Sequence, residues 1–172
     1  MNLTSGQLQT LKTSISANVN TVAFGGAQVA INALPNTDDA DIAIRNWYNQ
    51  TANPSFTAWK TMVTLRDILY AMDGNELAGL TTANTSRLQV RAGYGVAGEN
   101  PSIQSVRDFY ASVFSVGGVS ATAFLVLFKR LTTNAEKLFS TGTGSDGSPA
   151  TMSTTAEGQL SQQEVRSARN LP

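Results

Sequence analysis

The sequence predicts a mainly α-helical protein, with a compact multi-helix domain over residues 1–139 and an extended C-terminal arm over residues 140–172. Three observations lead to this fold class. Apolar residues recur at spacings of three and four, which place them on one face of a helix. Ser, Thr or Asn residues that can cap a helix precede several of these segments. At residue 140 the composition changes to small turn-forming residues, which marks the start of the arm.

The N-terminal part is expected to contain three helices. The first covers residues 5–19, where apolar residues are spaced by three, four and four positions. These residues are Leu8, Leu11, Ile15 and Val19. Residues 27–34 form a short apolar stretch between two glycines and a proline, and we expect a short helix there. Another helix is expected from residue 38, capped by Asn36 or Thr37, because three aspartates stand in its first turn, where the helix dipole favours negative charge.

The middle of the chain is expected to form shorter helices. Thr64 can cap a helix over residues 65–72, because Asp67 stands three residues later and can complete the cap. A weaker helical pattern follows over residues 85–92. An Asn-Pro pair at residues 100–101 is typical of the N-cap and the first helical position, so the next helix is expected to begin there.

The most apolar segment, residues 121–131, is expected to be the central helix of the domain. Almost no polar face is left on it, and a helix that is apolar all round is normally buried. Ser120 is its expected cap, and Thr133 with Glu136 forms a capping box for the helix that follows. The residues that we expect to be buried are Leu125, Leu127, Phe128 and Leu131.

The arm combines a linker with two structured segments. Residues 140–149 contain no apolar anchor, whereas residues 150–155 have the composition of a short strand. Ser161 and Glu164 form a capping box that opens a terminal helix reaching Arg169. A free tail would not need apolar residues, so we expect the arm to order by binding a partner. Its expected contact residues are Ala150, Thr151, Met152, Leu160 and Val165.

Composition excludes several classes of chemistry. The chain has no Cys and no His, which rules out a disulfide scaffold, a Cys/His zinc site, a Cys nucleophile and any triad with an imidazole base. Basic and acidic residues number 12 each, so no large basic field can hold nucleic acid by counterion release. No apolar run approaches the ~20 residues that span a bilayer, and the N-terminus does not resemble a signal peptide. We therefore expect a soluble protein made in the cytoplasm, without membrane contact.

Two motifs that could bind ligands have simpler interpretations. Residues 93–98 match the dinucleotide motif GxGxxG, but that motif needs a strand before it and a helix within it. A helical pattern precedes it here and an Asn-Pro pair follows, so we interpret it as a loop. Asp38, Asp39 and Asp41 could ligate a hard cation, but no glycine turn or bidentate Glu stands at loop spacing, so a helix N-terminus is the favoured interpretation.

Two clusters leave both a structural and a functional interpretation open. Lys129, Arg130 and Lys137 form a basic cluster that either complements a helix dipole or faces a DNA backbone. Aromatic residues gathered over residues 47–59 indicate a core or, less often, an interface. No constellation supports an active site, so we expect a protein that is not an enzyme and that holds neither cofactor nor metal.

Five segments of the C-terminal third form a recognisable series, and they are residues 125–139 (LVLFKRLTTNAEKLF), 141–144 (TGTG), 148–151 (SPAT), 157–160 (EGQL) and 165–169 (VRSAR). Together they resemble a group of small virion-associated proteins of tailed bacteriophages. That group shows an "LxALxKRxATxAExLFxxGTG" stretch, a "PATL" strand and an "EGxLxxxDVxxAR" ending, and its opening is similar to residues 8–12. This chain has Glu164 before Val165 where the group has Asp-Val.

The resemblance implies a structural component of the phage virion. A helical domain with a C-terminal arm resembles the head–tail connector (adaptor) proteins of the neck, which form a homo-oligomeric ring under the portal and reach into neighbouring subunits. A tail-tip, baseplate or tail-completion protein is the alternative within the same virion, and a carboxylate-dependent hydrolase is a third hypothesis from another class. The implied partners are further copies of the chain and other phage structural proteins from the portal or tail.

Overall fold

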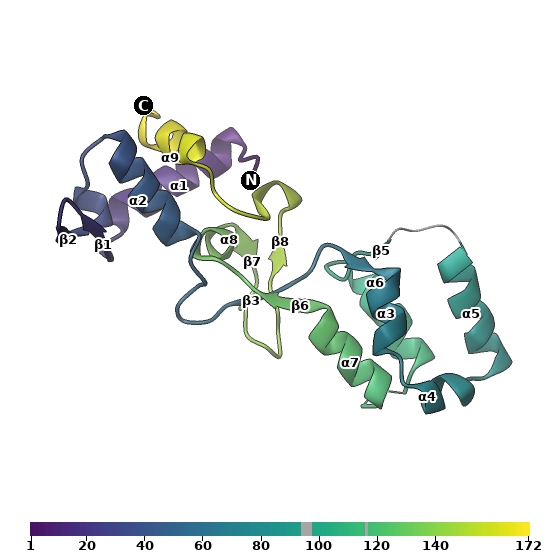
Figure 1. Ribbon diagram of the computed structural model, residues 1–172. Helices are drawn as coiled ribbons and strands as arrows, with labels where there is room; N and C mark the ends of the chain where they lie inside the picture. Colours follow the sequence, from purple (N-terminus) through teal and green to yellow (C-terminus); the bar gives the residue numbers. More distant parts are fainter. Residues whose placement is uncertain (94–97, 116) are drawn as a thin grey trace. The chain divides into compact units, whose positions relative to one another are not determined.

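A computed structural model describes residues 1–93, 98–115 and 117–172 of the chain. The protein is mainly α-helical, as the sequence predicts, and the short strands of the described part form two-stranded sheets (Figure 1). Contacts divide the chain into two compact units. We call residues 1–56 with 131–172 the discontinuous unit, and residues 57–130 the inserted unit. This division differs from the boundary at residue 140 that the change in composition suggested.

The discontinuous unit has a helical core built from both ends of the chain. Its core residues include Leu11 and Ile15 from the N-terminal helix and Val165 and Ala168 from the C-terminal one. Its elements are α1 (Ser5–Ala17), β1 (Thr21–Phe24), β2 (Ala27–Ala30), the 3-10 helix η1 (Ile31–Ala33), α2 (Asp38–Tyr48), α8 (Asn134–Leu138), β7 (Ser140–Thr141), β8 (Thr151–Met152), the 3-10 helix η2 (Thr154–Ala156) and α9 (Gln162–Arg169).

The inserted unit has its own apolar core, in which aromatic rings pack closely. Tyr110, Phe124 and Phe128 are buried together there, with Ile68 and Val63 beside them. Its elements are β3 (Thr57–Trp59), β4 (Val63–Thr64), α3 (Leu65–Ala71), α4 (Gly74–Ala78), α5 (Thr82–Gly93), β5 (Gly98–Glu99), α6 (Gln104–Val113), α7 (Val119–Leu127) and β6 (Lys129–Leu131), the last of which ends one residue past the unit.

Local helix signals are confirmed where a polar side chain can cap the backbone directly. Thr37 caps α2 by accepting a hydrogen bond from the Ala40 amide, and Thr64 caps α3 by accepting one from the Asp67 amide. The capping boxes predicted at Thr133 and Ser161 are both present. Such caps satisfy amides that have no partner within the helix, and they depend only on residues close in sequence.

The prediction of a short helix over residues 27–34 is wrong for most of these residues. Residues 21–30 form a β-hairpin, with Phe24 opposite Ala27, and only Ile31–Ala33 is helical. Gly25 and Gly26 join the strands with φ angles of 59° and 82°. A two-residue hairpin turn of this kind needs positive φ at both positions, which glycine supplies without strain.

Helix α6 begins later than the Asn-Pro pair predicts. The Asn100 side chain accepts a hydrogen bond from the Ser102 amide at 3.0 Å and so forms a turn, while α6 starts at Gln104. The side chain of Asn competes for local amides in this way both in turns and at helix N-termini. The dipeptide therefore marked a break in the chain correctly, but not the first residue of the helix.

Helix α7 is not buried on all sides. Phe128 is only 1% exposed, as predicted, and Leu127 is half-buried, whereas Leu125 is 50% exposed and Leu131 is 58% exposed. The prediction of burial is wrong for the last two residues. The expected helical segment 121–131 is also too long, because α7 ends at Leu127 and Leu131 lies in strand β6. The helix packs against α3 and α6 through one face, which holds Phe124. A sequence that is apolar all round does not indicate which face the core will take.

The C-terminal segment packs on its own chain. Helix α9 lies beside α1 and α2 (Figure 1), with Val165 and Ala168 fully buried. Strand β8 pairs with β7, so that Met152 stands opposite Ser140. Four of the five residues expected to contact a partner are therefore buried within this unit, namely Ala150, Met152, Leu160 and Val165. The fifth, Thr151, is exposed. This arrangement differs from the extended arm that the composition suggested. The turn-rich linker brings the residues that follow it back onto the helices of the same unit.

A buried ionic cluster holds α9 against α2. Asp41 is buried, and its carboxylate accepts hydrogen bonds from Arg169 Nη1 at 2.8 Å and Arg166 Nε at 3.3 Å. Arg169 also donates to the backbone carbonyls of Leu34 and Pro35. The acidic first turn of α2 is thus the N-terminus of a helix, as predicted, and it also anchors the C-terminal helix.

We expect Asp41→Ala to lower the free energy of unfolding by about 2–3 kcal/mol. Removing one partner of a buried pair leaves the other charge uncompensated, and the partial exposure of Arg166 moderates the loss. Urea denaturation followed by circular dichroism measures it. Asp39→Ala, on the same turn but exposed, is the matched control and should change stability by less than about 0.5 kcal/mol. Equal effects of the two substitutions would contradict the anchoring role of Asp41.

Candidate interaction surfaces of the inserted unit

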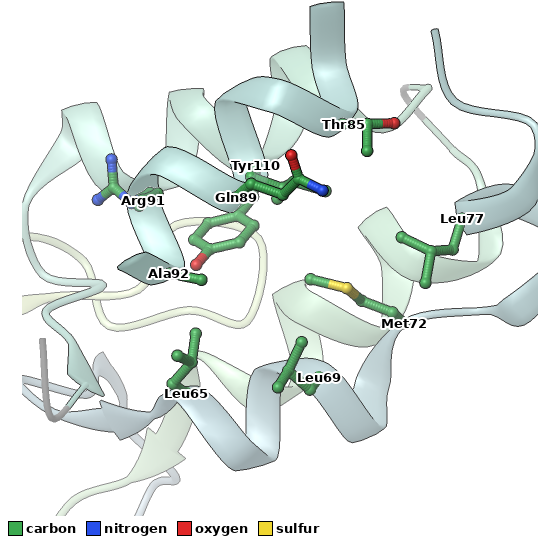
Figure 2. A pocket seen from close by; sticks show the side chains of 10 residues that line it. Leu65, Leu69, Met72, Leu77, Thr85, Gln89, Arg91, Ala92 and Tyr110 are labelled. Carbon is green, nitrogen blue, oxygen red and sulfur yellow. The ribbon is translucent and has the colours of Figure 1, made fainter. Parts of the chain in front are cut away.

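An apolar groove opens between α3 and α5 in the inserted unit. Its cavity measures 330 Å³. Figure 2 shows Leu65 and Leu69 of α3 pointing toward Tyr110 and toward Ala92 of α5 across this space. The full lining consists of Leu65, Leu69, Met72, Leu77, Thr85, Leu88, Gln89, Arg91, Ala92 and Tyr110.

The groove exists because α5 offers little apolar surface to its neighbours. The helix is rich in Thr, Asn, Gln and Arg, and none of its residues is buried. On the other side, α3 buries Ile68 in the core but leaves Leu69 55% exposed. An apolar side chain that lines an open space contributes little of the free energy that its full burial would provide. The lining is therefore available to an apolar partner.

The charged residues at the groove neutralise one another. The Arg91 guanidinium forms a paired hydrogen bond with the buried Glu99 carboxylate, with Nη2 to Oε2 at 2.7 Å, and lies over the Phe109 ring at 4.4 Å from its centroid. The Tyr110 hydroxyl donates to Glu99 Oε1 at 3.3 Å. Burial, reinforced by the negative charge of Glu99, raises the pKa of Tyr110, which keeps the hydroxyl protonated as a donor. The hydrogen bond to Glu99 also raises the pKa of Arg91. The groove thus presents an apolar surface, and Arg91, the charged residue of its described lining, is already paired.

A second apolar surface lies on α7. Val119, Thr122, Leu125 and Val126 are exposed, at positions i, i+3, i+6 and i+7, which fall on one face of a helix. We call these four residues the ridge. Helix α7 contains no charged residue. Exposed apolar residues that are scattered singly are ordinary, but a stripe along one helix face is typical of an interaction surface.

The position of the ridge is fixed by a cap from α4. The Glu76 carboxylate accepts hydrogen bonds from the backbone amides of Val119 and Ser120, each at 2.8 Å. Hydrogen bonds from Ser120 are the main cause that lowers the pKa of Glu76. The Ser120 hydroxyl in turn accepts a hydrogen bond from the Asp73 amide at 2.9 Å. The prediction that Ser120 caps this helix is wrong, because Gly118 occupies the N-cap position and Ser120 is already the second residue of α7.

The predicted basic cluster is divided between the two units. Lys129 and Arg130 lie in β6 and are half-buried. Lys137 is half-buried on α8 of the other unit, with its ammonium group 5.6 Å from the centroid of the Phe56 ring. The hypothesis that these residues face DNA stays a prediction.

The aromatic cluster is also divided, and most of it is core. Tyr48 is buried in the discontinuous unit, where Trp47 packs against its edge. Trp59 packs against the core of the inserted unit, with the Arg107 guanidinium 4.3 Å from its ring centroid. Phe56 packs closely against Gly144.

Within the described ranges, no group of three or more His, Cys, Asp or Glu could hold a metal ion. Asp38 and Asp41 are instead paired with arginines of α9. Residues 94–97 of the GxGxxG match lie outside the described residues. Across the part of the chain that the structure describes, no helix has the length and apolarity needed to cross a membrane.

Sequence reasoning missed both the groove and the ridge. The groove is assembled from short helices whose apolar residues are few, so none of them gives a strong signal alone. The ridge did have a signal, because residues 121–128 lack any charge, but the same signal is typical of a buried helix.

Comparisons with family models, with curated proteins and with solved structures gave no match to this chain.

Proposed function

We propose that this chain is a structural component of a tailed-phage virion, and specifically a head–tail connector (adaptor) protein of the neck that assembles as a ring. The observation that carries the proposal is the pair of apolar surfaces on the inserted unit, the groove, in which Arg91 is paired with Glu99, and the uncharged ridge. Surfaces of this kind suit subunit contacts, because apolar area removed from water stabilises an interface. The resemblance of residues 125–169 to virion-associated phage proteins supplies the biological setting.

Subunit contacts through the inserted unit replace the contacts first expected from the C-terminal arm. The arm residues Leu160 and Val165 are buried in their own unit, so they cannot bind a neighbour without unfolding part of it. The exposed apolar residues of α7 need no such rearrangement. We therefore assign ring formation to the inserted unit and a stabilising role to the C-terminal segment.

The lining of the groove argues against a carboxylate-dependent hydrolase at this site. Such an enzyme needs two carboxylates facing its substrate, with pKa values pushed apart by their surroundings. Of the lining residues in the described part of the chain, none is Asp or Glu, and the nearby Glu99 is paired with Arg91. The groove is therefore suited to binding a partner and not to catalysis by a pair of carboxylates.

Inactivating the gene in the phage that encodes this chain tests the proposal. For a neck protein we expect the mutant to accumulate DNA-filled heads and separate complete tails, both visible by electron microscopy, and antibody to label the neck of wild-type particles. Complete particles that fail only at adsorption, or tails that do not form, would indicate a tail-tip or tail-completion protein instead. Absence of the chain from purified particles would refute a virion role altogether.

A further inference from the structure

We infer that the ridge of one copy docks into the groove of the next copy, so that subunits join head to tail through their inserted units. This inference rests on the proposed function for its setting and deepens it by naming the occupant of the groove. The contact is heterologous, because it joins two different surfaces of the same chain. Contacts of that type close into a ring when the rotation between subunits allows it.

The two surfaces match in charge. Helix α7 carries no charged residue from Val119 to Leu127. Among the described residues that line the groove, the charged one is Arg91, whose guanidinium is held by Glu99. A charged partner segment would leave uncompensated charge in an apolar space, which is costly. The groove therefore favours an uncharged apolar segment, and α7 exposes one.

The sizes are also compatible. Deleting one buried Leu side chain from a helical protein leaves a cavity of about 150 Å³. The groove, at 330 Å³, has room for about two aliphatic side chains. Leu125 and Val126 are adjacent on the ridge and are 50% and 69% exposed, so they are the pair that we place in the groove.

One copy can use both surfaces at the same time. No residue of α7 lines the groove, and the groove is formed by α3, α4, α5 and Tyr110. Filling the groove of one copy therefore leaves its own ridge free for a further neighbour. A chain of such contacts uses the same two surfaces in every subunit, as a ring requires.

A mixing experiment tests the contact in solution with the full-length chain. Val126→Asp places a charge on the ridge, and Leu69→Asp places one at the edge of the groove. We expect the wild-type protein to form oligomers in sedimentation velocity, and each variant to associate at least about 30-fold more weakly. Mixed in equal amounts, the two variants should form a one-to-one dimer and nothing larger, because only one intact ridge can meet one intact groove.

Val90→Asp is the matched control, since Val90 is exposed on α5 but does not line the groove. It should oligomerise like the wild type. The contact is refuted if the wild-type protein is a monomer, if the mixture stays monomeric while both variants are folded by circular dichroism, or if Val90→Asp has the same effect as Val126→Asp.

Engineered cysteines give a second measurement that does not depend on the charged variants folding. The natural chain has no cysteine, so every thiol-specific cross-link reports the introduced residues. Treated with a short bis-maleimide, the double variant Leu69→Cys, Val126→Cys should give a ladder of covalent oligomers, whereas each single variant should stay monomeric on a denaturing gel. A ladder from Val126→Cys alone would indicate ridge-to-ridge contact and refute the inference.

The two proposals can fail separately. If the contact fails in these tests while the chain is found in the neck, only this inference is refuted. If the contact holds and the chain is absent from particles, the proposed function is refuted.

Discussion

Deleting residues 141–172 is expected to unfold the discontinuous unit. The deletion removes the fully buried Val165 and Ala168 together with Leu160, and it uncovers Leu11 and Ile44. Without Ala168, the two larger side chains lost (Leu160 and Val165) and the two uncovered, at about 1.5–3 kcal/mol each, amount to about 6–12 kcal/mol. That is of the same order as the whole stability of an ordinary domain, about 5–15 kcal/mol.

Far-UV circular dichroism and thermal melting of the truncated protein measure this effect. A point variant gives a sharper version of the experiment. Val165→Asp places a charge in the core and should abolish cooperative unfolding of this unit, whereas Gln163→Asp, exposed on the same helix, should leave it nearly unchanged. If the discontinuous unit of the truncated protein still unfolds cooperatively, the C-terminal segment is free to bind a neighbour, and ring formation through the arm becomes the better model.

Phe128→Ala is expected to destabilise the inserted unit by about 3–5 kcal/mol, because a large buried ring leaves a cavity that its neighbours cannot fill. The Phe128 ring is stacked on Phe124, with centroids 5.8 Å apart and planes at 12°, and it meets the edge of Tyr110 at 5.6 Å. Chemical denaturation monitored by near-UV circular dichroism, which reports the packing of aromatic rings, measures the loss.

Leu125→Ala, three residues earlier in the chain, is the matched control. Leu125 is exposed, so its truncation should cost less than about 1 kcal/mol in the monomer, although it should weaken the association of copies. A loss below 1 kcal/mol for Phe128→Ala would remove this residue from the core and with it our account of how α7 is oriented.

The two residues illustrate how far the sequence could predict the candidate site. The apolar run around α7 predicts a helix, and Phe128 is in the core as expected. It does not predict that Leu125 faces outward, because a helix that is apolar on every side has no polar face to identify the solvent. The ridge becomes visible only when α3 and α6 occupy the opposite side.

The groove could not be predicted for a related reason. Its residues come from α3, α4, α5 and α6, and each short helix contributes only a few apolar side chains. The space between them depends on how far α5 stands from α3, and this is set by the packing of the unit and not by any local pattern. The pairing of Arg91 in α5 with Glu99 in β5 leaves no unpaired charge on Arg91 at the groove. This pairing also depends on how two elements pack and not on a local sequence pattern.

By itself, the sequence determined the features that depend on neighbouring residues. It indicated the mainly α class, the helix starts capped by Thr37, Thr64, Thr133 and Ser161, and the exclusion of cysteine and histidine chemistry. These follow from side-chain to backbone hydrogen bonds and from composition, which act within a few residues. Only the tertiary structure decided that α9 belongs with α1 and α2 and that residues 57–130 form a separate unit. The physical reason is that Asp41, Arg166 and Arg169 recognise one another across more than a hundred residues of chain, a separation over which no periodicity carries information.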